Sequence, residues 1–109
     1  MQTDVLQGTL DMLVLKALSL ESTHGWGIAQ HIGRLSREVL VINQGSLYPA
    51  LQRLERKGLI SARWGESETG RKRKYYRLEA PARDAIDDER RQWNTMNIIL
   101  ARLWTPQNA

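Results

Sequence analysis

The chain has 109 residues, 41% of them hydrophobic, which is enough for one domain with a modest core. Because it has no cysteine and no apolar stretch long enough to span a bilayer, the sequence excludes disulfides, thiolate metal sites and membrane helices. The net charge of +4 is uneven, since residues 53–77 hold nine Lys or Arg against three Asp or Glu and so carry +6, whereas the rest of the chain carries −2.

A first helix is predicted to follow a cap at Asp4 and to run to Leu20. Asp11 and Lys16 mark its solvent face. Because no basic segment precedes its apolar run, the N-terminus does not resemble a signal peptide, and we expect a soluble cytoplasmic protein. The opposite face, which we expect to be mostly buried, carries Leu6, Leu10, Leu13, Val14, Ala17, Leu18 and Leu20.

Residues 21–25 are rich in turn-forming types, and a second helix is predicted directly after them. Gly25 and Gly27 flank Trp26, which leaves room either for the indole or for a closely packed neighbouring helix. The two histidines, seven residues apart, have no acidic or cysteine residue nearby at metal-ligand spacing, so we interpret both as surface residues and predict no metal site. The expected inner residues of this helix are Trp26, Ile28, Ala29, Ile32 and Leu35.

The next helix is the main candidate for a functional surface. Its leucines, spaced four and three residues apart, form one apolar stripe, and at roughly 100° per residue a polar and basic set falls opposite. Asn43 lies at its start, Pro49 is expected in about its first turn, and Gly58 supplies the left-handed residue that ends it. Such a helix suits the major groove of DNA, which is about 12 Å wide, and with the helix before it forms a helix-turn-helix. The outer set is Gly45, Pro49, Gln52, Arg53 and Arg56.

Beyond this helix the apolar period changes from 3.6 to 2, which predicts a β-hairpin. Residues 60–64 and 71–78 are the expected strands, and residues 65–70 between them are rich in turn formers. Trp64 and Tyr76 are expected to face inward, and the basic run Arg71–Lys74 lies near the tip. A hairpin of this size is typical of the wing of a winged helix-turn-helix. Its positive charge indicates a phosphate-binding surface, with a solvated basic face as the alternative.

Pro81 predicts the start of a last helix whose apolar residues follow a heptad spacing, interrupted at Glu89. Residues 84–92 are otherwise strongly polar. So small a core cannot easily cover so narrow a stripe on a long terminal helix, and we therefore expect the stripe to pack on a second copy of the chain. It consists of Ile86, Trp93, Met96, Leu100 and Leu103.

In these features the sequence resembles the PadR family of bacterial winged-helix transcription regulators, in matching order along almost its whole length. The resemblance implies a mainly α fold with a small β-hairpin: a winged helix-turn-helix DNA-binding domain over residues 1–78 and a long C-terminal dimerisation helix over residues 79–109. The chain departs from the family at Glu79 and Ala82, where Thr and Gly are usual, which weakens the expected cap of the last helix. The matching stretches are Leu6–Leu18, His24–Ile28, Gly45–Glu55 with Gly58 and Leu59, and Arg73–Leu78.

The resemblance also implies a function. The expected protein is a bacterial, nucleoid-associated homodimer without a cofactor, usually a repressor, that binds palindromic operators in double-stranded DNA. Its last helices join the two copies, with help from Leu6 and Leu10 of the first helix, and its paired basic surfaces lie about 34–36 Å apart, as successive duplex turns do. The implied DNA-binding residues are Gln44, Ser46, Tyr48, Gln52 and Arg53 on the recognition helix, and Arg71, Lys72, Arg73, Lys74 and Tyr75 on the wing.

Several of these residues have two open roles. Arg53 and Gln52 carry the donors that read guanine and adenine edges, but phosphate contact or solubility would use the same groups. Tyr48 either donates its hydroxyl to phosphate or packs its ring against the wing. Trp93 and Met96 either bind a planar aromatic effector at the dimer interface, as in some short relatives, or form interface core.

Two other classes of function are weighed against DNA binding. A winged-helix module with a basic wing also suits an acidic protein partner. An enzyme is disfavoured, because the sequence has no nucleophile–histidine–acid set, no phosphate loop and no paired carboxylates in a plausible pocket.

Overall fold

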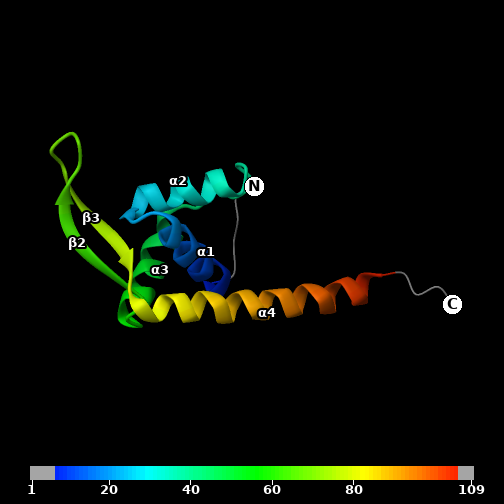
Figure 1. The fold of residues 1–109 in the computed structure, drawn as a ribbon. Helices are drawn as coiled ribbons and strands as arrows, with labels where there is room; N and C mark the ends of the chain where they lie inside the picture. Colours follow the sequence, from blue (N-terminus) through cyan, green and yellow to red (C-terminus); the bar gives the residue numbers. More distant parts are fainter. Residues whose placement is uncertain (1–6, 106–109) are drawn as a thin grey trace.

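The computed structural model describes residues 7–105, as four helices and a three-stranded antiparallel sheet (Figure 1). A head of three helices and the sheet is followed by one long helix, which projects well beyond it, and the molecule measures 66 × 29 × 21 Å. This is the winged helix-turn-helix with a long last helix that the sequence predicts; the proposed cap Asp4 and Leu6 lie outside the described residues. The elements are α1 (Gln7–Leu20), β1 (Thr23–His24), α2 (Gly25–Leu35), α3 (Gln44–Arg56), β2 (Ile60–Glu66), β3 (Lys72–Leu78) and α4 (Ala80–Trp104).

The core lies where α1 meets α2, α3, the sheet and the start of α4. Burial of a single leucine or isoleucine side chain contributes about 1.5–3 kcal/mol, so this one cluster accounts for most of the driving force of folding. Leu10, expected at a dimer interface, is only 3% exposed and belongs to the core of a single chain, so that prediction is wrong. The buried cluster is Leu10, Val14, Leu15, Ala17, Leu18, Ile28, Ile32, Leu47, Ala50, Leu51, Leu54, Ile60, Tyr76 and Ala82.

Both ends of α3 form as the sequence predicts. The Asn43 side chain accepts a hydrogen bond from the N–H of the third helical residue at 2.9 Å, as an N-cap does. At the other end Gly58 has a φ of +73°, and the Leu59 N–H donates to the Leu54 carbonyl at 3.0 Å, which closes the helix in a Schellman motif. Pro49, however, is the sixth residue of α3, in its second turn rather than its first. Because a proline has no N–H, α3 lacks one internal hydrogen bond there.

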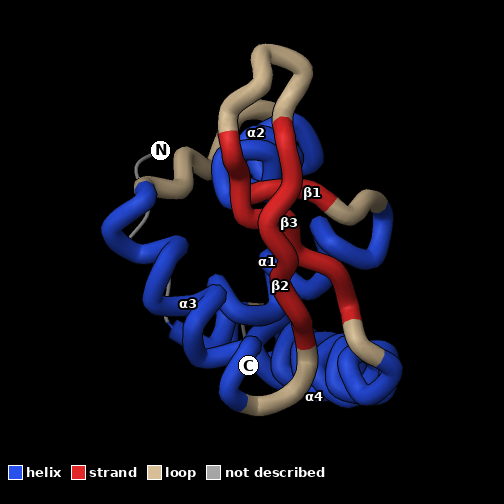
Figure 2. Tube along the Cα trace, turned by 90° about the vertical axis from the view of Figure 1, so that its left-hand side faces the viewer, coloured by secondary structure: helices blue, strands red, loops and turns tan. Residues whose placement is uncertain are grey.

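The sheet has the order β1-β3-β2, so that β3 is central (Figure 2). Strand β1 falls in the stretch predicted to be a turn: Thr23 pairs with Tyr76 and His24 with Tyr75. Two residues are too few to show a period-2 pattern, and this strand forms because the edge of β3 offers unpaired backbone groups.

Four residues expected to be buried are exposed because they lie near the ends of their elements, where the core does not cover them. Trp26 and Leu35 lie in the first and last turns of α2, at positions that the core does not cover, although Gly25 beside Trp26 is buried. Leu20 is the last residue of α1, and Trp64 lies on the part of the hairpin that extends beyond the helices. Their spacing indicates on which face of the element they lie, but periodicity does not say where the core ends.

Helix α4 has Pro81 in its first turn, as predicted, and its N-cap residue Glu79 makes no side-chain capping bond. Its first turns pack on the core through Ala82, Ala85 and Ile86, and the remainder leaves the head (Figure 1). Among residues 7–105, no helix is both long and apolar enough to cross a membrane.

Candidate nucleic-acid interface

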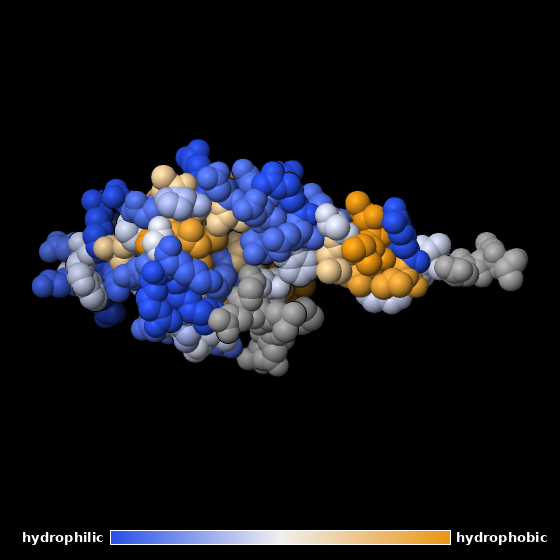
Figure 3. All heavy atoms as spheres, turned by 90° about the horizontal axis from the view of Figure 1, so that it is seen from below, coloured by the Kyte–Doolittle hydropathy of each residue, from blue (hydrophilic) through white to orange (hydrophobic). Residues whose placement is uncertain are grey.

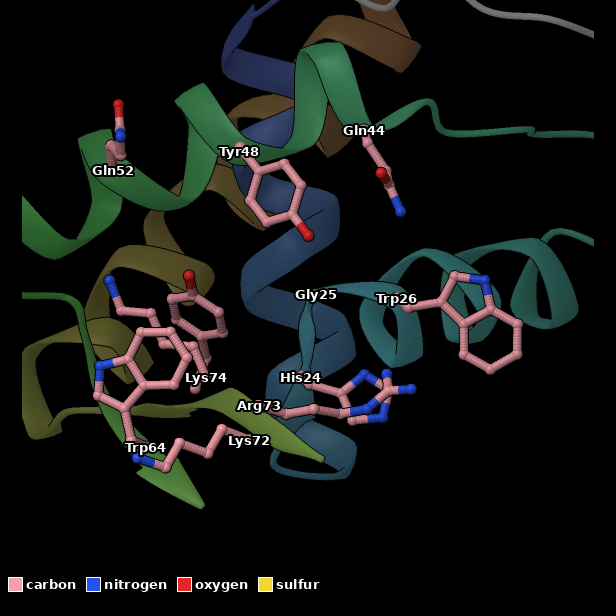
Figure 4. A pocket seen from close by; sticks show the side chains of 11 residues that line it. His24, Gly25, Trp26, Gln44, Tyr48, Gln52, Trp64, Lys72, Arg73 and Lys74 are labelled. Carbon is pink, nitrogen blue, oxygen red and sulfur yellow. The ribbon is translucent and has the colours of Figure 1, made fainter. Parts of the chain in front are cut away.

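An open groove of about 660 Å³ lies between α3, the start of α2 and the β-hairpin (Figure 4). Three elements that are distant in sequence therefore share one surface. Its lining combines amides, aromatic rings and ammonium or guanidinium groups, and no carboxylate is among the residues that line it. The lining residues are His24, Gly25, Trp26, Gln44, Tyr48, Gln52, Trp64, Lys72, Arg73, Lys74 and Tyr76.

Helix α3 contributes Gln44, Tyr48 and Gln52, which are spaced four residues apart and so lie on one side of the helix. All three are exposed; in Figure 4 the side chains of Gln44 and Tyr48 extend toward α2, whereas the Gln52 amide points away from the wing. Ser46 is also exposed but is not among the groove residues. The structure thus brings three of the five predicted recognition-helix residues to this groove.

Tyr48 lies against the first turn of α2. A Cβ added to Gly25 would stand 3.4 Å from the Tyr48 ring, so Gly25 leaves room for a neighbouring helix rather than for the Trp26 indole. At Gly27 an added Cβ would lie 2.3 Å from Thr23 Oγ1, and that space belongs to β1. Tyr48 therefore packs on α2, while its hydroxyl points into the groove (Figure 4).

The hairpin contributes three consecutive cations, Lys72, Arg73 and Lys74. Lys74 lies 3.6 Å from a carboxylate oxygen of Glu55 and 5.8 Å from the centroid of the Tyr76 ring, so α3 partly neutralises it. Both members of that ion pair are more than a third exposed, and such pairs contribute little to stability. Their association is weak enough for a phosphate to compete with Glu55.

Two predicted wing residues are not among those that line the groove. Arg71 belongs to the turn before β3. Tyr75 points to the other face of the sheet, where its ring lies against Gly65 and its hydroxyl donates to the Glu66 carbonyl at 3.4 Å.

His24 joins the sheet to α2 beside the groove. Its Nδ1 accepts a hydrogen bond from the Gly27 N–H at 3.0 Å, which makes it the N-cap of α2. The imidazole stacks on Trp26 at 6.4 Å and meets Tyr75 edge-on at 5.6 Å. Partial burial, with a smaller contribution from the nearby Arg73 guanidinium, lowers the pKa of His24 below its usual value of 6.5. The histidine predicted to be a surface residue thus has a structural role.

Arg53 is held on the other side of α3. Its Nη2 donates to Asp11 Oδ1 at 2.8 Å and its Nε to Asp11 Oδ2 at 3.4 Å, in a bidentate ion pair between α3 and α1. The expectation that Asp11 marks the solvent face of α1 is wrong, because this carboxylate faces α3. The sequence could not show the pair, since its members are 42 residues apart.

Two tryptophans that the sequence does not single out as site residues also line this groove. Trp64 is 69% exposed and Trp26 53%, and both line the groove together with the wing cations. Trp64 is the cross-strand partner of Lys74. Its position in sequence, shortly before a run of four cations, was the available signal, but the strand pattern pointed to burial.

Comparison with known proteins places this geometry in a family. Residues 14–88 match the model of the transcriptional regulator PadR-like family. A transcriptional regulator from Clostridium thermocellum is 27% identical, with a TM-score of 0.83 over 96% of this chain and 99% of that one. A PadR family transcriptional regulator from Eggerthella lenta is 30% identical, with a TM-score of 0.77 over 93% and 85% of the two chains. A PadR-like transcription factor from Bacteroides fragilis is 29% identical, with a TM-score of 0.73 over 89% and 91%.

Proposed function

The chain belongs to the PadR-like family of transcriptional regulators, and on that basis we propose that it represses transcription as a homodimer bound to palindromic operators in double-stranded DNA. Membership of this family makes it a DNA-binding transcription regulator rather than an enzyme.

The observation that carries the proposal is the groove shared by α3 and the wing. Gln44 and Gln52 present amides that can bond base edges, and a helix such as α3 fits a major groove about 12 Å wide. Lys72 and Arg73 line the same groove, and cations beside a recognition helix can bind the phosphates of the duplex backbone and so set the register. Tyr48 supplies a hydroxyl from between these two sets.

Two aromatic residues join this proposed interface. The exposed indoles of Trp26 and Trp64 stand on opposite sides of the groove (Figure 4). An indole packs well against deoxyribose and base edges, because its apolar ring loses water while its N–H keeps a hydrogen-bond partner.

The proposed dimer uses the part of α4 that projects from the head. Figure 3 shows apolar side chains gathered there, and residues 79–109 are accordingly the proposed dimerisation segment, with residues 1–78 as the DNA-binding domain. A second copy is the occupant that a heptad-like stripe fits, because the same stripe on the partner helix is complementary to it. The exposed residues of this stripe are Met96, Ile99 and Leu103, and its half-buried residues are Trp93 and Leu100. Ile99 is not part of the apolar stripe predicted from the sequence.

A planar aromatic effector between the two α4 helices is a finer part of the proposal. Trp93 is half-buried and Met96 is exposed in the single chain, so a ligand that reached both would lie at the proposed interface. Titration of tryptophan fluorescence with planar aromatic compounds tests this, with Trp93→Phe as the variant that should lose the quenching. Unquenched emission at high ligand concentration would leave these residues as interface core.

The DNA-binding surface is tested by neutralising the wing. Because Lys72 and Arg73 would each contact one phosphate, the double substitution to Gln should flatten the dependence of log K on log[salt] by about 1.8, at about 0.9 per contact. The double variant should lose the same affinity for a duplex from the chain's own promoter region as for a random duplex. Fluorescence anisotropy measures both affinities. Arg83→Gln/Arg90→Gln on α4 changes the charge equally and serves as the control.

An unchanged salt slope in the wing variant would contradict the proposed surface. If the wild-type protein shifted no duplex at any salt concentration, the alternative, an acidic protein bound by the same wing, would be favoured instead.

A further inference from the structure

The Asp11–Arg53 pair differs in kind from the other charged contacts of the head. Two nearly parallel N–H···O contacts, at 2.8 and 3.4 Å, join a planar guanidinium to a planar carboxylate. The side chains are 19% and 13% exposed, so water screens their attraction only partly. Of the ion pairs among residues 7–105, this is the most shielded.

The pair is placed on the element that would meet DNA. Arg53 belongs to α3, one residue after Gln52, yet it does not line the groove. A guanidinium binds carboxylate and phosphate through the same pair of donors, so Asp11 occupies the donors that a phosphate would need. If Arg53 left this pair to bind a phosphate, Asp11 would remain as a poorly solvated, unpaired carboxylate. Its negative charge would also repel the approaching phosphate.

We propose that Asp11 masks Arg53 from DNA, so that Arg53 is not a DNA contact and α3 presents one cation fewer to the phosphate backbone than its sequence contains. This inference rests on the proposed binding of duplex DNA. Its consequence is for specificity: non-specific affinity is set by the number of phosphate contacts, and masking one cation lowers affinity for random duplex. Asp11 is thus a positioning residue that acts through Arg53.

The test compares salt slopes on random duplex, by fluorescence anisotropy between 50 and 200 mM salt, a range in which phosphate contacts dominate. In Asp11→Asn, Arg53 loses its charged partner, so the slope should steepen by about 0.9 and the affinity should rise roughly fivefold near 0.15 M salt. Arg53→Gln should keep the wild-type slope. The double variant Asp11→Asn/Arg53→Gln should return to it, because no cation remains to be released.

The control is Asp87→Asn, which removes an equal charge from an exposed position on α4. It corrects for the change in net charge alone.

Two outcomes would overturn the masking role. One is a slope for Asp11→Asn that equals that of Asp87→Asn, and the other is a slope for Arg53→Gln that is flatter than wild type by about 0.9, as loss of a phosphate contact requires. If Asp11→Asn fails to fold, as judged by circular dichroism, the salt slope of Arg53→Gln decides alone: a wild-type slope supports the masking role, and a flatter slope overturns it.

Wild-type protein that binds no duplex would instead overturn the proposed function. The measurement on the wild type distinguishes that outcome from a failure of the masking role.

Discussion

At the scale of single residues, aromatic side chains give this groove a character that its charges alone do not. Trp64 is 69% exposed and lines the groove beside the wing cations, although its strand pattern predicts burial. A large ring left in water costs stability, at about 25 cal/mol per Å² of apolar surface, so its exposure is better explained by a surface that becomes covered on binding.

Trp64→Ala is therefore expected to weaken DNA binding about fivefold, or about 1 kcal/mol. In the wild type the exposed indole would be buried against the duplex on binding, and alanine removes that burial. Trp64→Phe should retain part of the affinity. Leu20→Ala, which removes an exposed apolar side chain at the end of α1, should bind as wild type does. Anisotropy titration of the three variants checks this, and equal affinity for all three would remove Trp64 from the interface.

His24 predicts how stability depends on pH. Its native pKa lies below 6.5, so between that lowered value and 6.5 the unfolded chain binds more protons than the folded one. The stabilisation that the His24 cap contributes is therefore fully present above pH 6.5. It is lost as the pH falls through the native pKa, because a protonated Nδ1 cannot accept from the Gly27 N–H.

The expected result is a lower melting temperature at pH 5.5 than at pH 7.5 in the wild type, with a smaller difference in His24→Asn, since asparagine caps helices without titrating in this range. His31→Gln, which removes the other histidine, should keep the wild-type difference. Thermal unfolding by circular dichroism measures all three, and an identical pH response in His24→Asn would rule out the capping imidazole as its source.

At the scale of elements, the end of α3 decides where the wing begins. Gly58 at φ +73° turns the chain out of the helix, and two residues later β2 starts. Left-handed backbone costs an L-residue with a Cβ about 1–2 kcal/mol, less for asparagine.

Gly58→Ala should accordingly lower the free energy of unfolding by about 1 kcal/mol and the melting temperature by roughly 4–8 °C. Gly58→Asn is the matched comparison and should lose less. Apart from the adjoining residues, no atom lies within 4 Å of a Cβ added at this position, so any loss reports backbone strain rather than a clash. Equal melting temperatures for alanine and glycine would show that the turn is not held in the left-handed region.

At the scale of the whole molecule, α4 has more apolar surface than one chain covers. Its 25 residues make a helix about 37 Å long at 1.5 Å per residue, and only the first turns pack on the head. The exposed apolar residues Met96, Ile99 and Leu103 therefore lie on the part that projects away from it (Figure 1).

Leu103→Asp should disrupt the proposed dimer, because it places a charge in the apolar stripe, and should weaken operator binding with it. Ile98→Asp is the matched control: Ile98 is also exposed, but at 100° per residue it falls on the opposite side of α4. Light scattering coupled to size exclusion gives the mass of each. A dimer that persists in Leu103→Asp, or a monomeric wild type, would contradict the assembly.

Several features of the fold are determined by neighbouring residues and could therefore be predicted from the sequence. The period of the leucines in α3, its Asn43 cap and its Gly58 terminus each depend on residues within a few positions of one another. Such interactions favour one conformation of a short segment wherever it lies in a fold, and they were confirmed. The concentration of positive charge before and within the wing was visible in the same way.

Only the tertiary structure decided which of these residues face the groove. The ion pair with Asp11 holds Arg53 away from the groove. The stretch predicted to be a turn pairs with β3 as a two-residue strand. The hairpin extends beyond the core, so that Trp64 is exposed. Each of these outcomes depends on where another element ends or on a partner more than ten residues away. A periodic pattern specifies a face but not the extent of the body that covers it, so burial and pairing at the edges of the core are properties of the assembled chain.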